Sequence, residues 1–397
     1  MNRRLNILTV TGFVLDDQAS GVNTMILTLD RSLTASCRSV MLENDWGAPR
    51  LLQRESGGLV HYALRLRSPY VAGKMVRGFF GWFLSFPAMM LDMRRLLREE
   101  AIDLIHVHYG QPYQYCFRLV HMIWGIPYIL TLHRGDIMSF PGLHAVDKAL
   151  VRFAFKGAQR VISVSQWLAD QAKAALGSLP QLGVIHNGLD VTALDMLDDP
   201  ELEKNLGFAV PDRFFLMVSN VAQYKAQDVA IRAWALVKEK HPDIPLLIVG
   251  DKRELWDECV RLIDELGCGA NVRLLGIRQR ATAVSLMRRA TAIVIPSRSE
   301  GLPYVVLEAG ALGKAVICSD IGPLTEVVSD GETGLVTPVE HHQAIASASL
   351  RLIGDPGLRE RLGGNLAQKV RAEFTAQRMA EKYLAVYSES LRGKVAA

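Results

Sequence analysis

Short runs of aliphatic and β-branched residues alternate along the whole chain with longer amphipathic stretches. Such runs, bounded by turn residues, predict buried strands, and the stretches between them predict helices. This alternation is typical of βαβ units and predicts the α/β class with parallel sheets. The strands expected in the first half are Leu5–Thr11, Ser39–Leu42, Leu59–Ala63, Leu104–Val107, Tyr128–Leu132, Val161–Val164 and Val184–Ile185, and those in the second half are Phe214–Val218, Pro245–Val249, Val272–Leu275, Ala292–Ile295 and Ala315–Cys318.

The pattern occurs twice, and the 397 residues exceed the roughly 250 to 300 that one hydrophobic core accommodates. We therefore predict two doubly wound, Rossmann-like domains. The segment between them is rich in Asp, contains two prolines and shows no strand pattern. The predicted parts are an N-terminal Rossmann-like domain at 1–190, a linker at 191–210, a C-terminal Rossmann-like domain at 211–370, and a C-terminal helix within 371–397 that packs back on the first domain.

Two facing domains of this kind place the carboxyl ends of both sets of strands around one cleft. Open α/β sheets bind ligands at these ends. We therefore expect the functional site between the domains.

Composition narrows the class of protein. The chain is 49% apolar and 22% charged, as folded globular proteins are. Its formal net charge of +4 comes without basic runs, so no nucleic-acid partner is expected. The five cysteines are scattered without metal-ligand spacing, which favours a reducing compartment. No cleavable leader is recognised in residues 2–15, so we expect a cytoplasmic protein.

One segment indicates a membrane surface. The longest apolar stretch, Gly78 to Leu91, contains Pro87 and is shorter than the about 20 residues of a spanning helix. Residues 65–98 combine aromatic side chains with seven basic residues and one acidic residue, Asp92. This composition predicts a peripheral helix on an anionic bilayer, at the inner face of the cell membrane. The alternative is a core helix whose arginines face water. The aromatic residues are Phe79, Phe80, Trp82, Phe83 and Phe86, and the basic ones are Arg65, Arg67, Lys74, Arg77, Arg94, Arg95 and Arg98.

The strongest chemical signal is the block from Pro296 to Gly310, which predicts a strand end, a loop and the start of a helix. Pro303 suits the first turn of that helix, where free backbone N–H groups bind anions. Two glutamates, Glu300 and Glu308, bracket the turn and predict two polar contacts to a ligand. The alternative is a pair of solvated helix carboxylates.

The residues around this block carry a family resemblance. Gly313 to Pro323 and Gly331 to Val336 follow it, and the first half contains His106-Val107-His108, Thr131-Leu132-His133, Val164-Ser165 and Asn187-Gly188-Leu189-Asp190. The whole closely resembles family 4 glycosyltransferases, which are retaining enzymes of the GT-B fold.

The resemblance implies that Glu300 contacts hydroxyls of a donor sugar and that Glu308 contacts the ribose of its nucleotide. It also implies that the amides of Gly301 and Leu302, with Pro303, lie near the diphosphate. These roles are physically sensible, because a carboxylate accepts hydrogen bonds from vicinal hydroxyls and is repelled by phosphate.

Members of the family bind the diphosphate with a Gly-Arg pair and a Lys five residues beyond the Arg. Here Lys225 matches that Lys, but Asn220 stands where the Arg is expected. Losing one charge-assisted contact weakens binding by about 1.5 to 3 kcal/mol unless another cation compensates. Arg298 is the expected substitute.

Three residues of the first half are further candidates. His133 ends an apolar strand, and the resemblance implies a contact with the donor sugar or the transition state; Asp136 follows it closely. Gly21 resembles the family's glycine in a loop near donor phosphate and acceptor, although a tight strand-to-helix turn explains a glycine equally well.

No metal and no cofactor are expected. The chain contains no Asp-x-Asp pair, and no third ligand follows His106 and His108. Glycine-rich dinucleotide and P-loop patterns are also missing from the sequence. Lys225 and a helix N-terminus would neutralise the leaving group instead.

We therefore predict a retaining, hexosyltransferase-like glycosyltransferase that transfers a sugar from a nucleotide-sugar donor to a hydroxyl of a glycan or lipid-linked acceptor. Bacterial polysaccharide or lipopolysaccharide biosynthesis is the expected setting, with His133, Glu300 and Lys225 as catalytic residues. One alternative is a non-catalytic, two-lobed sugar-nucleotide-binding protein, which the missing Arg at Asn220 favours. Another is a phosphorylase that uses pyridoxal phosphate, for which no cofactor lysine is identified.

Overall fold

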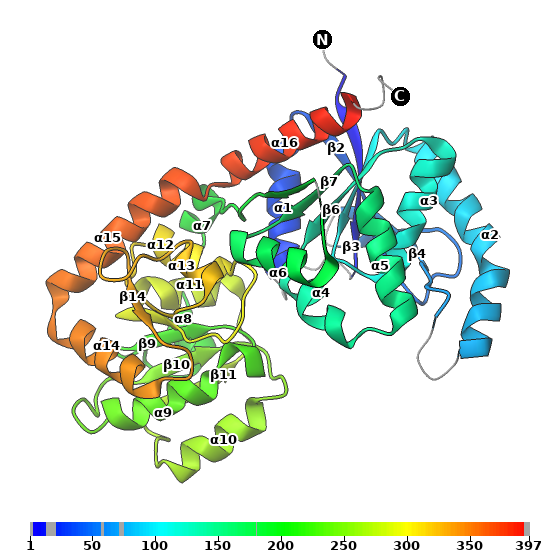
Figure 1. Cartoon of the computed structure of the whole chain (residues 1–397). Helices are drawn as coiled ribbons and strands as arrows, with labels where there is room; N and C mark the ends of the chain where they lie inside the picture. The colour runs from blue at the N-terminus through cyan, green and yellow to red at the C-terminus, as the bar shows by residue number, and fades with distance from the viewer. Residues whose placement is uncertain (1–2, 13–20, 57–58, 71–74, 180, 393–397) are drawn as a thin grey trace. The chain divides into compact units, whose positions relative to one another are not determined.

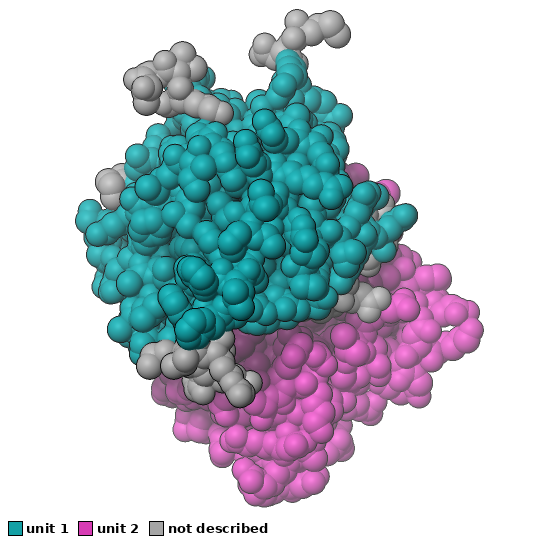
Figure 2. Space-filling view, turned by 90° about the vertical axis from the view of Figure 1, so that its right-hand side faces the viewer, with its two compact units in different colours: residues 1–186, 377–397 teal, residues 187–376 magenta. Residues whose placement is uncertain are grey.

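The computed structural model describes residues 3–12, 21–56, 59–70, 75–179 and 181–392. The chain divides into two compact units (Figures 1 and 2). Unit 1 comprises residues 1–186 and 377–397, and unit 2 comprises residues 187–376. Both are sheets of mainly parallel strands flanked by helices, which confirms the predicted fold class.

The described strands of unit 1 form one sheet in the order β3-β4-β2-β1-β5-β6-β7-β8. All neighbours are parallel except β3 and β4, which form an antiparallel edge. Every residue of β5 and β6 is buried, as expected for central strands covered on both faces. The strands are β1 (Leu5–Thr11), β2 (Cys37–Asn44), β3 (Leu52–Ser56), β4 (Leu59–Leu64), β5 (Leu104–His108), β6 (Tyr128–Leu132), β7 (Arg160–Ser163) and β8 (Leu182–Val184).

Helices connect these strands and cover the sheet. They are α1 (Gly21–Leu33), α2 (Met75–Glu99), η1 (Pro112–Gln114), α3 (Tyr115–Trp124), α4 (Arg134–Ser139), η2 (Phe140–Gly142), α5 (Ala145–Gly157) and α6 (Gln166–Leu176). Local sequence sets their ends. Ser165 caps α6 by accepting a hydrogen bond from the Leu168 N–H, and Gly125 ends α3 in a left-handed conformation that suits glycine.

Unit 2 repeats the architecture with the strand order β11-β10-β9-β12-β13-β14, all parallel. Its strands are β9 (Phe215–Val218), β10 (Leu246–Val249), β11 (Val272–Gly276), β12 (Ala292–Ile295), β13 (Val316–Ser319) and β14 (Leu335–Thr337). Its helices are α7 (Val191–Asp195), α8 (Leu202–Leu206), η3 (Gln223–Lys225), α9 (Gln227–Val237), α10 (Trp256–Glu265), α11 (Arg280–Arg289), α12 (Tyr304–Ala311), α13 (Gly322–Thr325), α14 (His342–Gly354) and α15 (Pro356–Glu373).

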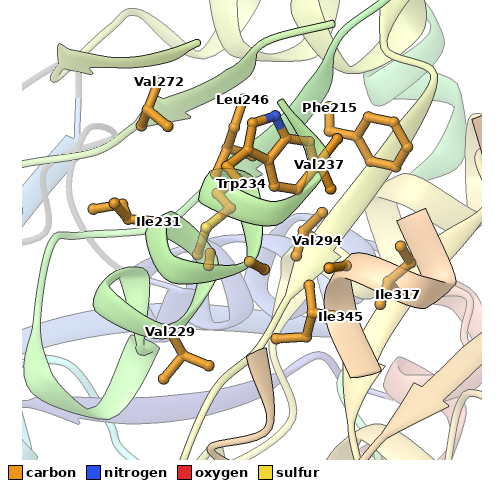
Figure 3. Packing of buried hydrophobic residues seen from close by; sticks show 14 of the residues in the cluster. Phe215, Val229, Ile231, Trp234, Val237, Leu246, Val272, Val294, Ile317 and Ile345 are labelled. Carbon is orange, nitrogen blue, oxygen red and sulfur yellow. The ribbon is translucent and has the colours of Figure 1, made fainter. Parts of the chain in front are cut away.

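The core of unit 2 is built around α9 and the sheet (Figure 3). Trp234 is fully buried and packs edge-to-face on Phe215 with ring centroids 5.0 Å apart. Its indole N–H donates to the Ile244 carbonyl at 3.1 Å, so burying this side chain leaves no unsatisfied donor. The strand ends that carry polar loops therefore rest on a rigid base.

Residues 191–210 were predicted to be a linker, but they lie within unit 2 and form α7 and α8. Asp190 caps α7 by accepting a hydrogen bond from the Ala193 N–H at 3.0 Å. The aspartates that suggested a linker composition therefore include helix caps, which favour the same residue type.

The last helix, α16 (Ala376–Arg392), belongs largely to unit 1. Its Tyr383 and Tyr387 are fully buried there. Unit 1 is consequently discontinuous in sequence, because both ends of the chain contribute to it.

The five cysteines are free and buried. No helix in the described ranges is long and apolar enough to cross a bilayer.

Candidate functional site

The block from Pro296 to Gly310 forms the loop after β12 and the buried helix α12. Pro303 is the N-cap of α12, one position before the first turn in which it was predicted. Its φ of −74° is compatible with both positions, so the sequence pattern could not separate them. Two hydrogen bonds hold this loop: Asn187 Nδ2 donates to the Leu302 carbonyl at 2.9 Å, and the Tyr304 hydroxyl donates to the Gly188 carbonyl at 3.0 Å.

Glu300 is nearly buried and is bonded to the residue predicted to bind phosphate. Lys225 Nζ donates to Glu300 Oε1 at 2.7 Å, and the Ser297 hydroxyl donates to the same oxygen at 2.6 Å. The two charged side chains are only 15% and 6% exposed. The structure therefore brings two of the three predicted catalytic residues into direct contact, as an ion pair shielded from water.

Asn220 lies between β9 and the η3 turn that carries Lys225. Its Oδ1 accepts a hydrogen bond from the Asp251 N–H at 3.3 Å, and its carbonyl accepts one from Gln227 Nε2 at 2.9 Å. The chain passes β10 closely here, because a Cβ built on Gly250 would lie 1.9 Å from the Ser219 carbonyl oxygen. Asn220 thus ties two strand ends together and supplies no positive charge.

Arg298, the expected substitute cation, is held by carboxylates. Its guanidinium makes a bidentate pair with Asp228, at 3.0 and 2.7 Å, and a second pair with Glu340. These bonds to carboxylates, Glu340 first, raise the pKa of Arg298 further above its ordinary value. A direct contact of Arg298 with diphosphate would have to replace one of these partners.

Glu308 is also ion-paired, to a residue that the sequence did not single out. Arg280, the first residue of α11, donates to Glu308 Oε1 at 2.9 Å. Burial nevertheless raises the pKa of Glu308, and Arg280 works against that rise. The rest of α11, strand β12 and the loop after it separate the two residues in sequence, so no local spacing could have indicated their contact.

In unit 1 the predicted histidines form a buried histidine cluster, defined by His106, His108, Thr131, His133, Tyr383 and Tyr387. His106 Nδ1 lies 2.8 Å from the Tyr387 hydroxyl, and its Nε2 lies 2.7 Å from Thr131 Oγ1. Thr131 Oγ1 is also 3.1 Å from the Tyr383 hydroxyl. The two tyrosines come from α16, and their role was not predicted because they are remote in sequence.

His133 caps α4 and is linked to His108. Its ring accepts a hydrogen bond from the Asp136 N–H, while the Asp136 carboxylate accepts one from the His133 N–H at 2.7 Å. His133 Nε2 lies 3.3 Å from His108 Nδ1. Both ring nitrogens of His133 therefore have polar neighbours within the protein.

Burial controls protonation in this cluster. It lowers the pKa of His106 and of His133 to about 3 and that of His108 well below its ordinary value. It raises the pKa of Asp136 to about 7, against the hydrogen bonds that its carboxylate accepts. The histidines are consequently neutral at physiological pH.

Gly21 is the exposed first residue of α1. The loop before it, residues 13–20, lies outside the described residues, so its predicted phosphate-binding geometry stays a prediction. Gly12 is the last described residue before that loop and follows strand β1. A Cβ built on Gly12 would lie 3.6 Å from Tyr109 Cδ2 and 3.6 Å from the Tyr113 hydroxyl. Gly21, His133 and Asp136 belong to unit 1, whereas Asn220, Lys225, Arg298, Glu300 to Pro303 and Glu308 belong to unit 2.

No group of three or more His, Cys, Asp or Glu side chains suited to a metal ion occurs in the described part of the chain. Lys225, at 15% side-chain exposure, is the predicted cation whose partner is a single carboxylate.

Comparison with known proteins assigns both halves of the chain. Residues 19–193 match the family described as Glycosyltransferase Family 4, and residues 198–369 match the family described as Glycosyl transferases group 1. The chain is 30% identical over 327 residues to a D-inositol 3-phosphate glycosyltransferase from Actinosynnema mirum, covering 78% of each protein. It is 26% identical over 307 residues to an N-acetyl-alpha-D-glucosaminyl L-malate synthase from Bacillus anthracis, covering 77% of this chain and 79% of that protein.

Solved structures share the fold. Sucrose-phosphate synthase from Thermosynechococcus elongatus matches with a TM-score of 0.77 and 20% identity, covering 98% of this chain and all of that one. HepE from Anabaena, in complex with UDP and glucose, matches with a TM-score of 0.77 and 18% identity, covering 97% and 100%. Sequence and fold together confirm the predicted resemblance: this chain belongs to the family 4 glycosyltransferases and is an enzyme of the GT-B fold.

Proposed function

We propose that the enzyme uses a nucleotide-sugar donor, which binds to unit 2 at Lys225, Glu300 and Glu308, with the loop of Gly301, Leu302 and Pro303 beside the diphosphate. The observation that carries this proposal is the buried Lys225–Glu300 pair, at 2.7 Å. It holds a cation suited to diphosphate next to a carboxylate suited to sugar hydroxyls. HepE, a protein of the same fold, was solved in complex with UDP and with UDP-glucose, which supports this class of donor.

In the proposed reaction the bond between the anomeric carbon and the donor phosphate oxygen breaks, and a bond from an acceptor hydroxyl forms on the same face of the sugar. The acceptor proton passes to the departing phosphate oxygen. Lys225 stabilises the charge that develops on the diphosphate, and Glu300 orients the sugar. The contact of His133 with the donor sugar stays a prediction; burial lowers the pKa of His133 to about 3, so it would act as a neutral group.

The proposed mechanism needs no divalent metal. Leaving-group charge would be met by Lys225 and by the N-terminal end of α12. Exhaustive treatment with EDTA should therefore leave transfer unchanged. Loss of activity that added manganese restores would contradict this part of the proposal.

The donor can be found by thermal stabilisation. A nucleoside diphosphate at about 100 times its dissociation constant stabilises the folded protein by about 2.7 kcal/mol. We would screen UDP, GDP and ADP first, and then the sugar conjugates of whichever nucleotide binds. Release of nucleoside diphosphate on incubation with the conjugate and an acceptor separates catalysis from the alternative of a non-catalytic sugar-nucleotide-binding protein.

We also propose that α2 binds the anionic surface of a membrane and thereby reaches a lipid-linked glycan acceptor. One face of this helix is apolar and exposed: Phe80 and Phe83 are 60% exposed, Leu84 76% and Leu91 62%. Arg94, Arg95 and Arg98 are exposed on its last turns. In Figure 1 α2 runs along the outside of unit 1, beyond α3. Exposed aromatic residues followed by arginines suit the boundary between acyl chains and anionic headgroups.

The predicted aromatic cluster of α2 is divided between two faces. Trp82 donates through its indole N–H to the Tyr115 hydroxyl on α3 at 2.5 Å, so it faces the unit rather than solvent. Asp92 is buried against Arg50, and its charge does not oppose an anionic surface. Lys74 and the side chain of Arg77 lie outside the described residues. The alternative of an ordinary core helix does not account for the exposed phenylalanines.

Flotation with vesicles tests the membrane proposal. Wild-type protein should float with phosphatidylglycerol-containing vesicles at low salt and much less at high salt. The triple variant Phe80→Ser, Phe83→Ser, Leu84→Ser should lose this binding. The double variant Met122→Ser, Ile123→Ser is the matched control, because these residues are 66% and 61% exposed but lie on α3. Wild-type protein that never floats would contradict the proposal.

This surface supports the cytoplasmic, peripheral location and the role in bacterial polysaccharide or lipopolysaccharide assembly that the sequence suggested. A lipid-linked acceptor presents its sugar at the bilayer surface, where a helix such as α2 would hold the enzyme. Transfer to a lipid extract but not to the same sugars in free form would support an acceptor of this kind.

A further inference from the structure

Arg298 uses all of its hydrogen-bond donors within the protein. A guanidinium has five N–H donors in a fixed fork. Nε and one donor of Nη2 bind Glu340; the other donor of Nη2 and one of Nη1 bind Asp228; and the second donor of Nη1 binds the Gln223 carbonyl. No donor is left for a ligand. The two carboxylates also exceed the single positive charge, so the group as a whole is not cationic.

The same residue holds the turn that carries Lys225. Its guanidinium binds the Gln223 carbonyl, and its backbone N–H donates to the Tyr224 carbonyl at 2.8 Å. These are the two residues that precede Lys225 in η3. Arg298 also precedes Glu300 by two residues on the loop after β12, so it connects the two segments whose side chains form the Lys225–Glu300 pair.

Two residues near Arg298, one after η3 and one after β14, have a left-handed backbone conformation. Ala226 follows η3 with a φ of 58°, and Glu340 binds Arg298 with a φ of 64°. Such conformations cost non-glycine residues about 1 to 3 kcal/mol and persist where surrounding contacts enforce them. Arg298 binds the Gln223 carbonyl, which also accepts the Ala226 N–H, and it binds the Glu340 side chain, so its bonds lie beside both strained residues.

We propose that Arg298 is a positioning residue: it clamps the η3 turn to the Glu300 loop, with Asp228 and Glu340 as its anchors, and so places Lys225 for the donor diphosphate without touching the diphosphate itself. This inference rests on the proposed function of Lys225 and Glu300. It replaces the sequence-based expectation that Arg298 is the cation that substitutes for Asn220.

Replacing Asp228 or Glu340 tests whether Arg298 positions Lys225 or contacts the diphosphate directly. The two roles predict opposite changes in the affinity for nucleoside diphosphate. Asp228→Asn and Glu340→Gln should each weaken binding of UDP, GDP or ADP, whichever binds the wild type, because Lys225 is released from its position. If Arg298 contacted the diphosphate, the same changes would free its charge and tighten binding. Asp251→Asn is the control for removing a nearby negative charge, because Asp251 pairs with Arg253 and not with Arg298.

The second measurement asks whether Arg298 acts through Lys225. Arg298→Gln should weaken binding of the nucleoside diphosphate about tenfold in the wild type and by less than about twofold in a Lys225→Ala background. Arg298→Lys should restore little, because an ammonium cannot reproduce the fork. Equal losses in both backgrounds, or full rescue by Lys, would overturn the clamp.

Hydrogen exchange tests the clamp without any ligand. The Lys225 N–H donates to the Ala222 carbonyl at 2.8 Å, and the Ala226 N–H donates to the Gln223 carbonyl at 3.4 Å. Arg298→Gln should speed exchange of these two amides, whereas Lys225→Ala should leave it near the wild-type rate. Unchanged exchange in Arg298→Gln would overturn the clamp. Failure of wild-type protein to bind UDP, GDP or ADP would instead overturn the proposed donor site, and the exchange rates would still decide the clamp.

Discussion

The histidine cluster of unit 1 and the candidate site of unit 2 differ in the charge of their polar side chains. In unit 1 the buried histidine cluster is a chain of neutral groups, joined by hydrogen bonds between His106, Thr131, Tyr383 and Tyr387. In unit 2 the candidate site is a set of ion pairs, of which Lys225–Glu300 and Arg280–Glu308 are the central ones. The side chains of the histidine cluster are neutral, whereas those of the candidate site in unit 2 are charged and paired.

Depth explains the difference. His106 and His108 are fully buried, where an ionised group would be costly, whereas Arg280 is 41% exposed and can stay charged. Lys225 and Glu300 are only 15% and 6% exposed, and each keeps its charge because the other neutralises it. The hydrogen bonds among His106, Thr131, Tyr383 and Tyr387 fix the geometry of this neutral network. Ion pairs at the edge of a site can exchange one partner for an incoming anion. Unit 1 is therefore suited to hold a fixed surface, and unit 2 to bind a charged ligand.

The largest expected effect is a loss of stability in acid that originates in unit 1. The folded-state pKa values of His106 and His133, about 3, lie below the unfolded value of 6.5. Their contribution to the free energy of unfolding is therefore fully present above pH 6.5 and is lost as pH falls toward 3. His108 adds to this loss, and Asp136 opposes it between about pH 4 and 7. Near pH 5 unfolding should take up about two protons, or roughly 3 kcal/mol per pH unit.

Denaturant titrations of wild type and Asp136→Asn at several pH values check this prediction. Because the pKa of Asp136 is raised in the folded state, its contribution to the free energy of unfolding is lost as pH rises toward 7. Asp136→Asn should therefore be more stable than wild type at pH 7, and its free energy of unfolding should fall more steeply as the pH is lowered. A free energy of unfolding that stays constant from pH 7 to pH 5 would contradict the neutral cluster.

The next effect concerns the Lys225–Glu300 pair. Lys225→Ala should weaken binding of the nucleoside diphosphate about ten- to a hundredfold and also reduce stability by about 3 kcal/mol, because Glu300 is left buried without its cation. Lys252→Ala is the control, because Lys252 is 60% exposed in its ion pair with Asp257. This change should alter neither nucleotide affinity nor stability.

Adding Glu300→Gln to Lys225→Ala separates the two losses. Stability should return in large part, because the buried carboxylate is neutralised, whereas affinity should stay low. Calorimetry and thermal melts measure the two quantities. Recovery of both together would mean that Lys225 acts only through Glu300 and not on the ligand.

The two glutamates should differ from each other. Glu300→Gln should lower turnover with the nucleotide sugar and spare affinity for the nucleoside diphosphate, because its proposed partner is the sugar. Glu308→Gln should weaken both about tenfold, because its proposed partner is the ribose. Identical effects in steady-state kinetics and calorimetry would contradict separate roles.

The smallest expected effect is on stability and concerns two alanines with a positive φ, one in each unit. Ala101, with a φ of 48°, is exposed, and Ala101→Gly should raise the free energy of unfolding by about 0.5 kcal/mol. Ala226, with a φ of 58°, is fully buried. In Ala226→Gly the relief of backbone strain should therefore be offset by the loss of a buried methyl group, which contributes about 0.8 kcal/mol. Denaturant melts that rank the two variants in the opposite order would contradict this account.

Much of the fold could be predicted because its strands are buried on both faces. Leu5–Thr11, Tyr128–Leu132 and Ala292–Ile295 have the predicted bounds. The edge strand Leu52–Ser56 was missed, since its sequence LQRES has no buried face to impose a pattern. It owes its conformation to antiparallel pairing with β4.

The site shows the same division. Glu300 and Lys225 could be recognised from local motifs, but their contact could not, because 75 residues separate them. Arg298 was expected to meet phosphate because its charge was visible in the sequence. Its anchors Asp228 and Glu340 lie 70 and 42 residues away, so the charge balance became visible only in three dimensions.

The contribution of α16 to unit 1 affects the order in which the two units can complete their folding. During synthesis, residues 187–376 emerge before the segment that supplies Tyr383 and Tyr387. Unit 2 is continuous and can fold as soon as it leaves the ribosome, whereas the first unit to be translated lacks the hydroxyl partners of His106 and Thr131 until the end. Unit 1 therefore completes its fold last, and a chain whose synthesis stops within the final helix would contain a complete unit 2 and an incomplete core in unit 1.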